Sequence, residues 1–218
     1  MLCYSVGRLT PTPLELNELE NQVILGSLLG DGSLNLPRNW PYFHERKKEA
    51  HHDYLKWKSQ VLTRFSPKVV PPKKGGFPGS STMVGFRTLC SPAFMPYYWD
   101  FYGSGTKRVP PLQALNHVGP LALAVWYMDD GSLSGGSGGS ALTLHTEGFS
   151  LEDQLILQRW FEENWSLFSK VHPIKRKEIS LYQLKMYGNS MRRFLKVTEL
   201  FIQPIMRYKW DRKKIGGE

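Results

Sequence analysis

The sequence predicts an α+β (mixed α/β) fold built from two copies of one αββαββα unit. Two apolar segments with the length of a helix, 24–32 and 123–131, each end abruptly in Asp-Gly. The same order of expected helices and strands follows each segment. Matching residues such as Asp31 and Asp130 are separated by a nearly constant offset of 99 residues. A duplicated unit explains these observations better than any single-core fold.

Each motif is followed by an expected hairpin, a helix, two strands and a final helix. Ser150 precedes the longest of these helices, and Asp153 follows three residues later, which is close to a capping-box pattern. Leu155, Ile156, Trp160 and Phe161 give this helix one apolar stripe, which we interpret as a core face. In order, the expected elements are hairpin 33–46, helix 51–65, strands 68–73 and 82–89, helix 91–102, hairpin 132–146, helix 151–165, strands 170–176 and 179–186, and helix 189–201.

The repeat also suggests how the chain is divided. We expect an N-terminal half over residues 14–103 and a C-terminal half over 120–210, joined by a linker at 104–119. A basic tail, 211–218, follows. The Ser- and Gly-rich stretch 134–140 reads like a flexible linker but lies inside the second hairpin. We interpret it as a mobile hairpin tip that becomes ordered on DNA.

Composition limits the classes of protein that fit. A chain of 218 residues with 41% hydrophobic residues can bury a real core. No apolar run reaches the roughly 18–20 residues of a membrane span, and the N-terminus lacks the pattern of a signal peptide. We therefore expect an intracellular protein of the cytoplasm, the nucleus or an organelle matrix (mitochondrion or chloroplast). Cys3 and Cys90 are too few for a disulfide framework or a zinc cage. Most of the seven Trp residues, Trp99 among them, are expected in the core.

The net charge of +9 is concentrated in the last quarter of the chain. Residues 1–169 carry 15 Lys and Arg against 15 Asp and Glu, whereas residues 170–218 carry 13 against 4. Within the first part, acids gather on expected helices and basic residues on expected strands. This separation suggests a basic sheet surface. Binding of DNA or RNA explains such a surface better than a set of solvated lysines does. The basic residues concerned are Arg38, Arg46, Lys47, Lys48, Lys68, Lys73, Lys74 and Arg87.

The Asp-Gly endings place a carboxylate at the unfavourable end of each helix. Gly is common just past a helix end, but an Asp in the last turn faces the negative end of the helix dipole, at a cost of about 0.3–1 kcal/mol. If the two helices pack side by side, Asp31 and Asp130 meet at one point, and their like charges need compensation. Divalent cations with oxygen ligands provide it most naturally, so the sequence predicts a metal site.

The two motifs resemble those of the LAGLIDADG family of homing endonucleases. The Trp-Tyr-Met-Asp-Asp-Gly ending of the second copy is similar to the two-motif branch that includes a yeast mitochondrial intron-encoded enzyme, which cuts as a monomer. The resemblance implies that Asp31 and Asp130 are the metal-binding catalytic acids. It also implies that the two sheets line up into a long, concave, saddle-shaped surface on double-stranded DNA, with no obligate protein partner.

The family also has small residues where its two helices meet. Gly26 and Gly30 fall at those positions in the first copy, but Val125 and Asp129 occupy the matching positions in the second. We therefore expect the close approach of the two helices to depend mainly on the first helix.

By the same resemblance, each half supplies a lysine. The Lys-Arg-Val-Pro segment that starts at Lys107 and the Met-Arg-Tyr-Lys segment that ends at Lys209 match the family's patterns. Lys107 follows Asp31 by 76 residues and Lys209 follows Asp130 by 79. An ordinary phosphate contact or a surface charge is the alternative for either lysine, and the internal symmetry favours catalysis.

A pair of acids in the two hairpins matches polar residues that hold water in the family's pocket. Glu45 and Glu147 fall at similar places in their hairpins. A surface acid is the alternative for each.

The candidate DNA contacts lie on the expected strands. Alternate side chains of a strand can read base edges in the major groove. Arginine and lysine suit guanine edges, and Asn35, Asn39 and Gln183 suit adenine edges. Each side chain could equally hold a phosphate or point to solvent, because sequence alone does not fix strand parity. The candidates are Arg38, Arg46, Lys73, Arg87, Lys175 and Gln183.

The expected chemistry is hydrolysis of two phosphodiester bonds across the minor groove. Divalent ions held by Asp31 and Asp130 would activate water, while Lys107 and Lys209 would stabilise developing charge. Magnesium suits an all-oxygen site with few protein ligands, and manganese should substitute for it. The resemblance implies short 3′ overhangs in the product.

Two other functions stay open on the same fold. An intron maturase would bind intron RNA and assist splicing, and some members of the family do both. A catalytically inactive DNA-binding protein is the other, which the presence of both acids and both lysines disfavours.

Overall fold

A computed structural model describes residues 15–74, 81–135, 140–176 and 179–210 of the chain. The basic tail 211–218 and most of the expected hairpin tip, 136–139, lie outside the described residues.

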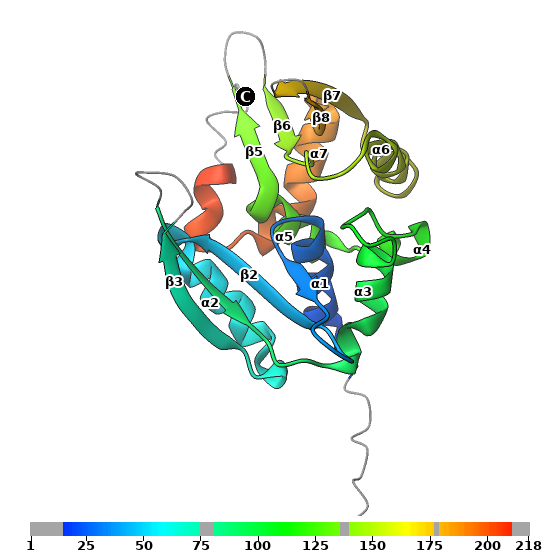
Figure 1. The fold of residues 1–218 in the computed structure, drawn as a ribbon. Helices are drawn as coiled ribbons and strands as arrows, with labels where there is room; N and C mark the ends of the chain where they lie inside the picture. The colour runs from blue at the N-terminus through cyan, green and yellow to red at the C-terminus, as the bar shows by residue number, and fades with distance from the viewer. Residues whose placement is uncertain (1–14, 75–80, 136–139, 177–178, 211–218) are drawn as a thin grey trace, which may run out of the picture.

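The first half is a four-stranded antiparallel sheet with helices on one side (Figure 1). Helix α1 carries a capping box between Asn17 and Glu20, which satisfies backbone groups at its start. The strand order is β1-β2-β4-β3. Its elements are α1 (Glu18–Leu29), β1 (Ser33–Asn35), β2 (Tyr42–Lys48), α2 (His52–Val61), β3 (Lys68–Lys74), β4 (Thr82–Arg87) and α3 (Met95–Tyr102).

The second half repeats this architecture, with strand order β5-β6-β8-β7. The expected cap on α6 is present, because Ser150 and Asp153 form a capping box. A short helix, α4 (Leu112–Leu115), lies between the two halves. The elements of the second half are α5 (Pro120–Asp130), β5 (Gly131–Ser134), β6 (Ala141–Leu144), α6 (Leu151–Trp165), β7 (Ser169–Arg176), β8 (Ile179–Tyr187) and α7 (Gly188–Thr198).

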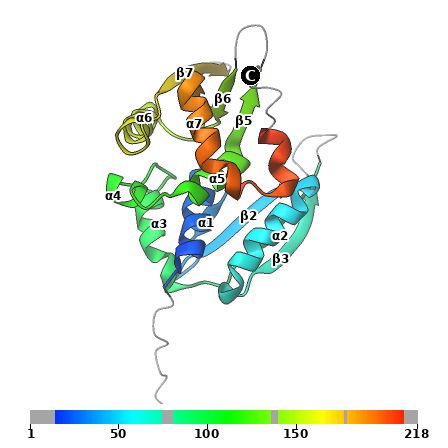
Figure 2. The same ribbon diagram turned by 180° about the vertical axis from the view of Figure 1, so that it is seen from behind.

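Both sheets have one covered face and one open face. The strands of the first sheet lie in front of α2 in Figure 1, and the reverse view in Figure 2 shows α2 and α7 in front of the strands. The covered faces carry buried residues such as Phe43 and Phe86 in the first sheet and Leu142 and Leu184 in the second. The expected pair of αββαββα units is therefore present.

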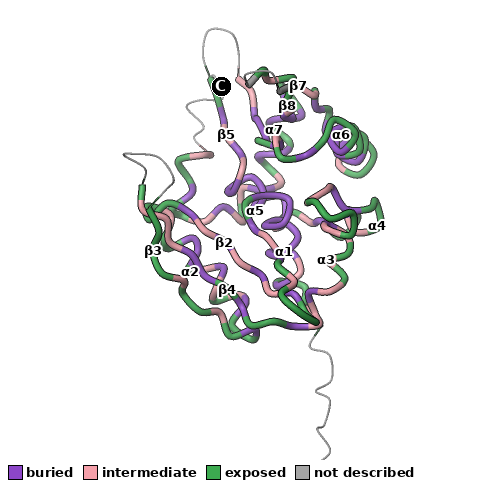
Figure 3. The backbone as a smooth tube through the Cα atoms, viewed as in Figure 1, coloured by how far each residue is buried: buried purple, intermediate pink, exposed green. Residues whose placement is uncertain are grey.

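Helices α1 and α5 pack against each other at the centre of the molecule, where the backbone is almost wholly buried (Figure 3). The contact is close because Gly26 has no side chain. A Cβ atom at Gly26 would lie 2.3 Å from the Ala122 carbonyl oxygen and 2.7 Å from Val125 Cβ. The close approach expected from the first helix is thus observed.

Several helices are shorter than expected because their ends tighten into 3₁₀ turns. The expected helix 51–65 is α2 flanked by the 3₁₀ turns Glu49–His51 and Thr63–Phe65. The expected helix 91–102 begins as a 3₁₀ turn, Pro92–Phe94, and α3 follows it, because Pro96 lacks the amide that a continuous helix would require at that position. Helix α7 ends at Thr198.

The assignment of two apolar groups to the core was wrong. Trp99 is 60% exposed on α3. On α6, Leu155 and Ile156 are exposed, while Leu157 joins Trp160 and Phe161 on the buried face. The buried stripe is thus displaced by part of a turn from the expected one, since i and i+3 or i+4 neighbours share a helix face.

No helix among the described residues is long and apolar enough to cross a membrane.

Candidate active site

Asp31 and Asp130 lie at the same end of the central helix pair. Asp31 follows α1 directly after Gly30, and Asp130 is the last residue of α5. Because the two helices pack side by side, their C-terminal ends meet between the two sheets (Figure 1). The two carboxylates are close enough for the charge of Asp31 to act on Asp130.

The structure brings Lys107 and Lys209 to the same place. The Lys107 Nζ donates to the carbonyl oxygens of Gly30 and Gly32, at 2.8 and 2.9 Å, on either side of Asp31. Lys209 Nζ donates to the carbonyl oxygens of Met128 and Asp129, at 2.7 and 3.0 Å. Each lysine thus satisfies carbonyls at the end of one motif helix, where a positive charge also offsets the helix dipole.

The ionisation of these groups is strongly perturbed. Burial, reinforced by the charges of Asp31 and Asp129, raises the pKa of Asp130 to about 8. Burial lowers the pKa of Lys107 and the pKa of Lys209 to about 8, against the opposing effect of the acids. Shifts of this size, in a cluster of groups with opposite charge, are typical of functional sites.

The two acids fit a magnesium ion with few protein ligands. Among the described residues, no group of three or more His, Cys, Asp or Glu side chains could hold a metal by itself. Mg²⁺ commonly binds through one or two carboxylates, retains water and takes its other ligands from substrate phosphates. A divalent cation would also supply positive charge to the half-buried Asp130 carboxylate. Asp31 and Asp130 are the residues that would hold it.

Glu45 and Glu147 do not occupy equivalent positions. In the first sheet Ser33 pairs with His44, and in the second Ser132 pairs with Thr143. The counterpart of Glu45 is therefore the buried Leu144, whereas Glu147 lies beyond the end of β6 and contacts His145. Glu45 is itself fully buried and paired with lysine, so the expectation of two matched residues that hold pocket water was wrong in its symmetry.

A buried network of charges, which sequence reasoning missed, surrounds Glu45. Lys58 Nζ lies 2.8 Å from Glu45 Oε2 and 2.9 Å from Asp129 Oδ2. Lys47 Nζ lies 2.9 Å from Asp129 Oδ1 and 2.5 Å from Asp31 Oδ2. Asp129 thus reaches from the second motif to two lysines of the first half. We call Glu45, Lys47, Lys58 and Asp129 the buried charge network.

Gly30 makes room for this network. A Cβ atom at Gly30 would lie 2.5 Å from Asp129 Cβ and 2.9 Å from its Oδ2. The only sequence signal was that Asp129 departs from the small residue of the family pattern. The pairing itself has no local signature, because Lys58 and Asp129 are 71 residues apart.

The open face of the first sheet gathers basic side chains. Residues that pair across antiparallel strands lie on the same face. Arg46 is on the side of β2 opposite to the buried Phe43, and His44 on the same side pairs with Arg87 of β4. Lys73 pairs with Met83, two residues from Gly85, and therefore shares this face. Arg38 is exposed in the turn between β1 and β2.

The second sheet corrects the two candidates expected there. Lys175 pairs with Ser180, which has the strand parity of the buried Leu184, so Lys175 points to the helix side of the sheet, although it is exposed there near the end of β7. Gln183 has the parity of the open face but is only 8% exposed. Among the side chains that the structure describes on β7 and β8, Lys170 and Lys185, which pair with each other, are the lysines on the open face.

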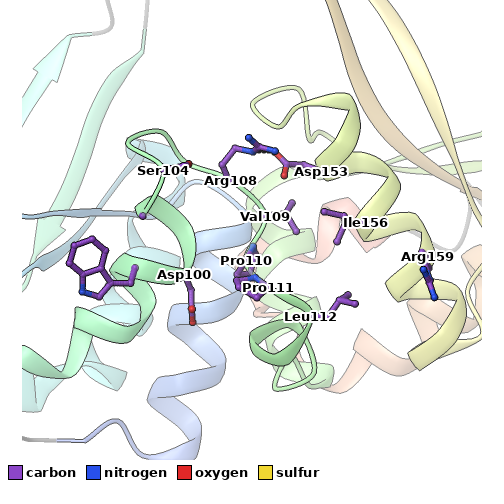
Figure 4. A pocket seen from close by; sticks show the side chains of 12 residues that line it. Asp100, Ser104, Arg108, Val109, Pro110, Pro111, Leu112, Asp153, Ile156 and Arg159 are labelled. Atoms are coloured by element: carbon purple, nitrogen blue, oxygen red, sulfur yellow. Dashed lines mark hydrogen bonds and ion pairs between the residues drawn. The ribbon is translucent and has the colours of Figure 1, made fainter.

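A pocket of about 510 Å³ lies elsewhere, between α3, the segment after it and α6 (Figure 4). Its lining includes Trp99, Val109 and Ile156, and none of the candidate catalytic residues. Arg108 and Asp153 point toward one another at its rim and form an ion pair of 2.8 Å. Neighbouring Lys107 and Arg108 therefore serve different places, the acid cluster and the contact with α6.

Comparisons with known proteins agree with this geometry. The model of a family described as the LAGLIDADG DNA endonuclease family matches residues 21–194. The DNA endonuclease I-ChuI of Chlamydomonas applanata is 26% identical over 210 residues, which cover 90% of this chain and 96% of the relative. The cytochrome b mRNA maturase bI2 of Debaryomyces hansenii is 27% identical, with 90% of this chain and 74% of the relative covered.

Some relatives are much longer. The chain is 29% identical over 209 residues to a protein named RecA from Mycolicibacterium flavescens, with 90% of this chain covered, and it spans only 47% of that relative's length. Among solved structures, the homing endonuclease I-WcaI bound to its DNA recognition sequence has a TM-score of 0.77 at 22% identity, with 90% of this chain and 87% of that chain covered. This similarity establishes the fold.

Proposed function

The chain belongs to the LAGLIDADG DNA endonuclease family, and we propose that it is a site-specific endonuclease that cuts both strands of a DNA target. One observation carries the proposal: two acids and two lysines, one of each from either half, converge where α1 and α5 end. A DNA-binding protein without catalysis has no need of carboxylates at this point, because they repel phosphate.

The two acids and the two lysines have different roles in the proposed reaction. Asp31 and Asp130 are the residues that would hold divalent cations, which would supply Lewis acidity and an activated water at the phosphate. Lys107 and Lys209 are held beside these acids by backbone carbonyls, so each is positioned to stabilise negative charge on a phosphate that enters the site. Burial lowers the pKa of both lysines to about 8, which brings their deprotonation closer to neutral pH.

The position of the cluster suits cleavage across the minor groove. Both acids lie at one point, so the two scissile phosphates must be close together, as they are across a groove about 6 Å wide. Short 3′ overhangs are the product that we propose. Since both halves of the site belong to one chain, a monomer is sufficient.

Selection of cleavable sites from a randomised DNA library tests the function and identifies the target together. We expect the protein to linearise a plasmid bearing the selected site with Mg²⁺ or Mn²⁺, and expect no cleavage in excess chelator. Asp31→Asn and Asp130→Asn should each lower cleavage by about 100-fold or more, because each removes a charged metal ligand. Full cleavage by both variants would refute the proposal.

Maturase activity is the second candidate function, because a maturase relative is matched over 90% of this chain. We infer that such an activity would use intron RNA as partner and would survive loss of the two acids. Splicing of the cognate intron by an Asp31→Asn variant would establish it, and absence of splicing with the wild-type protein would exclude it.

A further inference from the structure

Three of the four members of the buried charge network, Glu45, Lys47 and Lys58, belong to the first half, and the equivalent positions of the second half carry uncharged residues. The 99-residue offset and the strand register place Leu144 opposite to Glu45 and Thr146 opposite to Lys47 in the second half. The same offset places Leu157 at the position of Lys58. Leu144 and Leu157 are fully buried in the core. Equivalent interior positions are thus filled by apolar side chains in the second half and by charged side chains in the first.

Stability alone does not account for these charges. Replacing a buried ion pair by apolar residues of similar volume is often neutral or stabilising, because the desolvation of both charges is avoided. Leu144 and Leu157 show that the fold accommodates apolar residues at two of these positions. The role of the network is therefore inferred from its contacts, and Lys47 contacts Asp31.

The two catalytic acids differ in this respect. Lys47 Nζ is 2.5 Å from Asp31 Oδ2, and its side chain is only 4% exposed, so its position is fixed by packing and by Asp129. Among the described residues, no Lys, Arg or His lies within ion-pair distance of the Asp130 carboxylate. Thr146, at the position of Lys47, donates to Gln154 Oε1 at 2.7 Å instead.

We propose that Lys47 is a positioning residue for the half-site of Asp31, and that it makes the two half-sites chemically unequal. Lys47 binds Oδ2 and so fixes the orientation in which Asp31 presents its other oxygen. Asp129 anchors Lys47 from the opposite half, so the position of Asp31 also depends on the contact between α1 and α5. Cleavage of one DNA strand therefore depends on Lys47, and cleavage of the other does not.

This inference rests on the proposed function, and the first experiment separates the two. Cleavage of each strand is followed by labelling the two strands of the selected target differently. Lys107→Met identifies the strand served by the Asp31 half, and Lys209→Met identifies the other. Wild-type protein that cuts neither strand would contradict the proposed function itself.

Lys47→Met then tests the inference. We expect cleavage of the strand identified by Lys107→Met to slow by about 10–100-fold, because a catalytic group is no longer held in place. The other strand should slow by less than about threefold, so nicked DNA accumulates. Destabilisation of the protein alone would lower the cleavage rates of both strands equally. Equal lowering of the two rates, or no change in either, therefore overturns the inference. Thr146→Val is the matched control at the equivalent position and should leave the ratio of the two rates unchanged.

Binding of Mn²⁺ to the protein without DNA provides a second readout, measured by electron paramagnetic resonance. Lys47→Met removes a positive charge beside Asp31 and should tighten Mn²⁺ binding by about fivefold. Asp31→Asn in the same chain should abolish this gain. Tighter binding with slower cleavage is not expected of a structural defect, and unchanged Mn²⁺ affinity contradicts the inference.

If Lys47→Met fails to fold, the charge-balanced double variant Lys47→Met/Glu45→Gln keeps the test decisive. It retains the Lys58–Asp129 pair and removes one charge of each sign from the buried charge network. The same asymmetry between strands and the same gain in Mn²⁺ affinity are expected, and their absence overturns the inference.

Discussion

A single missing side chain sets the distance between the two motif helices. Gly26 of α1 faces the backbone of α5, and a Cβ atom at this position would lie 2.3 Å from the Ala122 carbonyl oxygen. The Ala122 carbonyl belongs to the first turn of α5 and cannot rotate away as a flexible side chain can. The spacing of Asp31 and Asp130 at the ends of these helices therefore depends on Gly26.

We expect Gly26→Ala to destabilise the protein by about 2 kcal/mol. Overpacking of a core costs about 1–3 kcal/mol, and the helix preference for alanine over glycine returns about 1 kcal/mol at most. The melting temperature should fall by about 4–8 °C for a chain of this size.

Gly148→Ala is the control for that measurement. No atom lies within 4 Å of a Cβ at Gly148, and its backbone conformation is available to alanine. Its melting temperature should match that of the wild-type protein within about 1–2 °C. An equal fall for both variants would show that helix spacing is not the cause.

At the scale of elements, the start of α1 is fixed by an acid that serves two partners. Glu20 accepts from the Asn17 backbone amide in the capping box, and Arg64 donates to both of its carboxylate oxygens at 2.8 and 2.7 Å. Burial favours a higher pKa for Glu20, but these hydrogen bonds and the charge of Arg64 outweigh it and lower the pKa below its usual range.

The lowered pKa gives a pH-dependent prediction. The stability that ionised Glu20 provides is fully present above the pKa of the unfolded chain, 4.5, and is lost as the pH falls through the lower pKa of the folded protein. We expect Glu20→Gln to lose about 1–2 kcal/mol at pH 7 in urea unfolding, and to lose progressively less below pH 4.

Glu18→Gln is the matched change in the same helical turn. Glu18 also lies in the first turn of the helix, but among the described residues its side chain accepts a hydrogen bond from Gln22 alone. Its effect should be below about 0.5 kcal/mol at pH 7. If Glu20→Gln shows a constant loss from pH 7 to pH 2, the ion pair with Arg64 is not its source.

The sequence predicted local elements better than it predicted contacts between distant residues. The motif helices and their acids were predictable because one local pattern occurs twice at a constant spacing, and the two lysines were predicted from the resemblance to the LAGLIDADG family. The buried charge network was not predictable, because Lys47 looks like a surface residue of a basic run, Lys58 looks like a surface residue of a helix, and their partner Asp129 is distant in the chain. Long-range pairing leaves no periodicity in the sequence.

Strand parity is the other property that the sequence could not provide. A shift of one residue in register moves every side chain of a strand to the opposite face. Lys175 is therefore a candidate on charge alone, and the register places it on the covered side of the second sheet. Arg46 and Arg87 are candidates for the same reason and fall on the open face.

At the scale of the whole molecule, the open faces of the two sheets form the surface that we propose for DNA. Basic residues on the first are Arg46, Lys73 and Arg87, and those on β7 and β8 are Lys170 and Lys185. The charge excess of the last quarter is thus divided between this surface and other parts of the molecule, such as the exposed Arg192 and Arg193 of α7. Net charge alone does not distinguish these residues, so we use position on the open face to predict which of them bind DNA.

We therefore expect Lys170→Ala and Lys175→Ala to differ although they remove the same charge from the same strand. A lysine that contacts phosphate releases about one counterion, so Lys170→Ala should weaken binding to the selected target and reduce the slope of log affinity against log salt concentration by about 1. Lys175 lies on the covered side, so its loss should leave this slope unchanged and weaken binding less than about twofold through the long-range field. Fluorescence anisotropy with labelled target DNA in Ca²⁺, between about 50 and 200 mM salt, measures both slopes. Equal slopes for the two variants would show that net charge, and not the face of the sheet, governs binding.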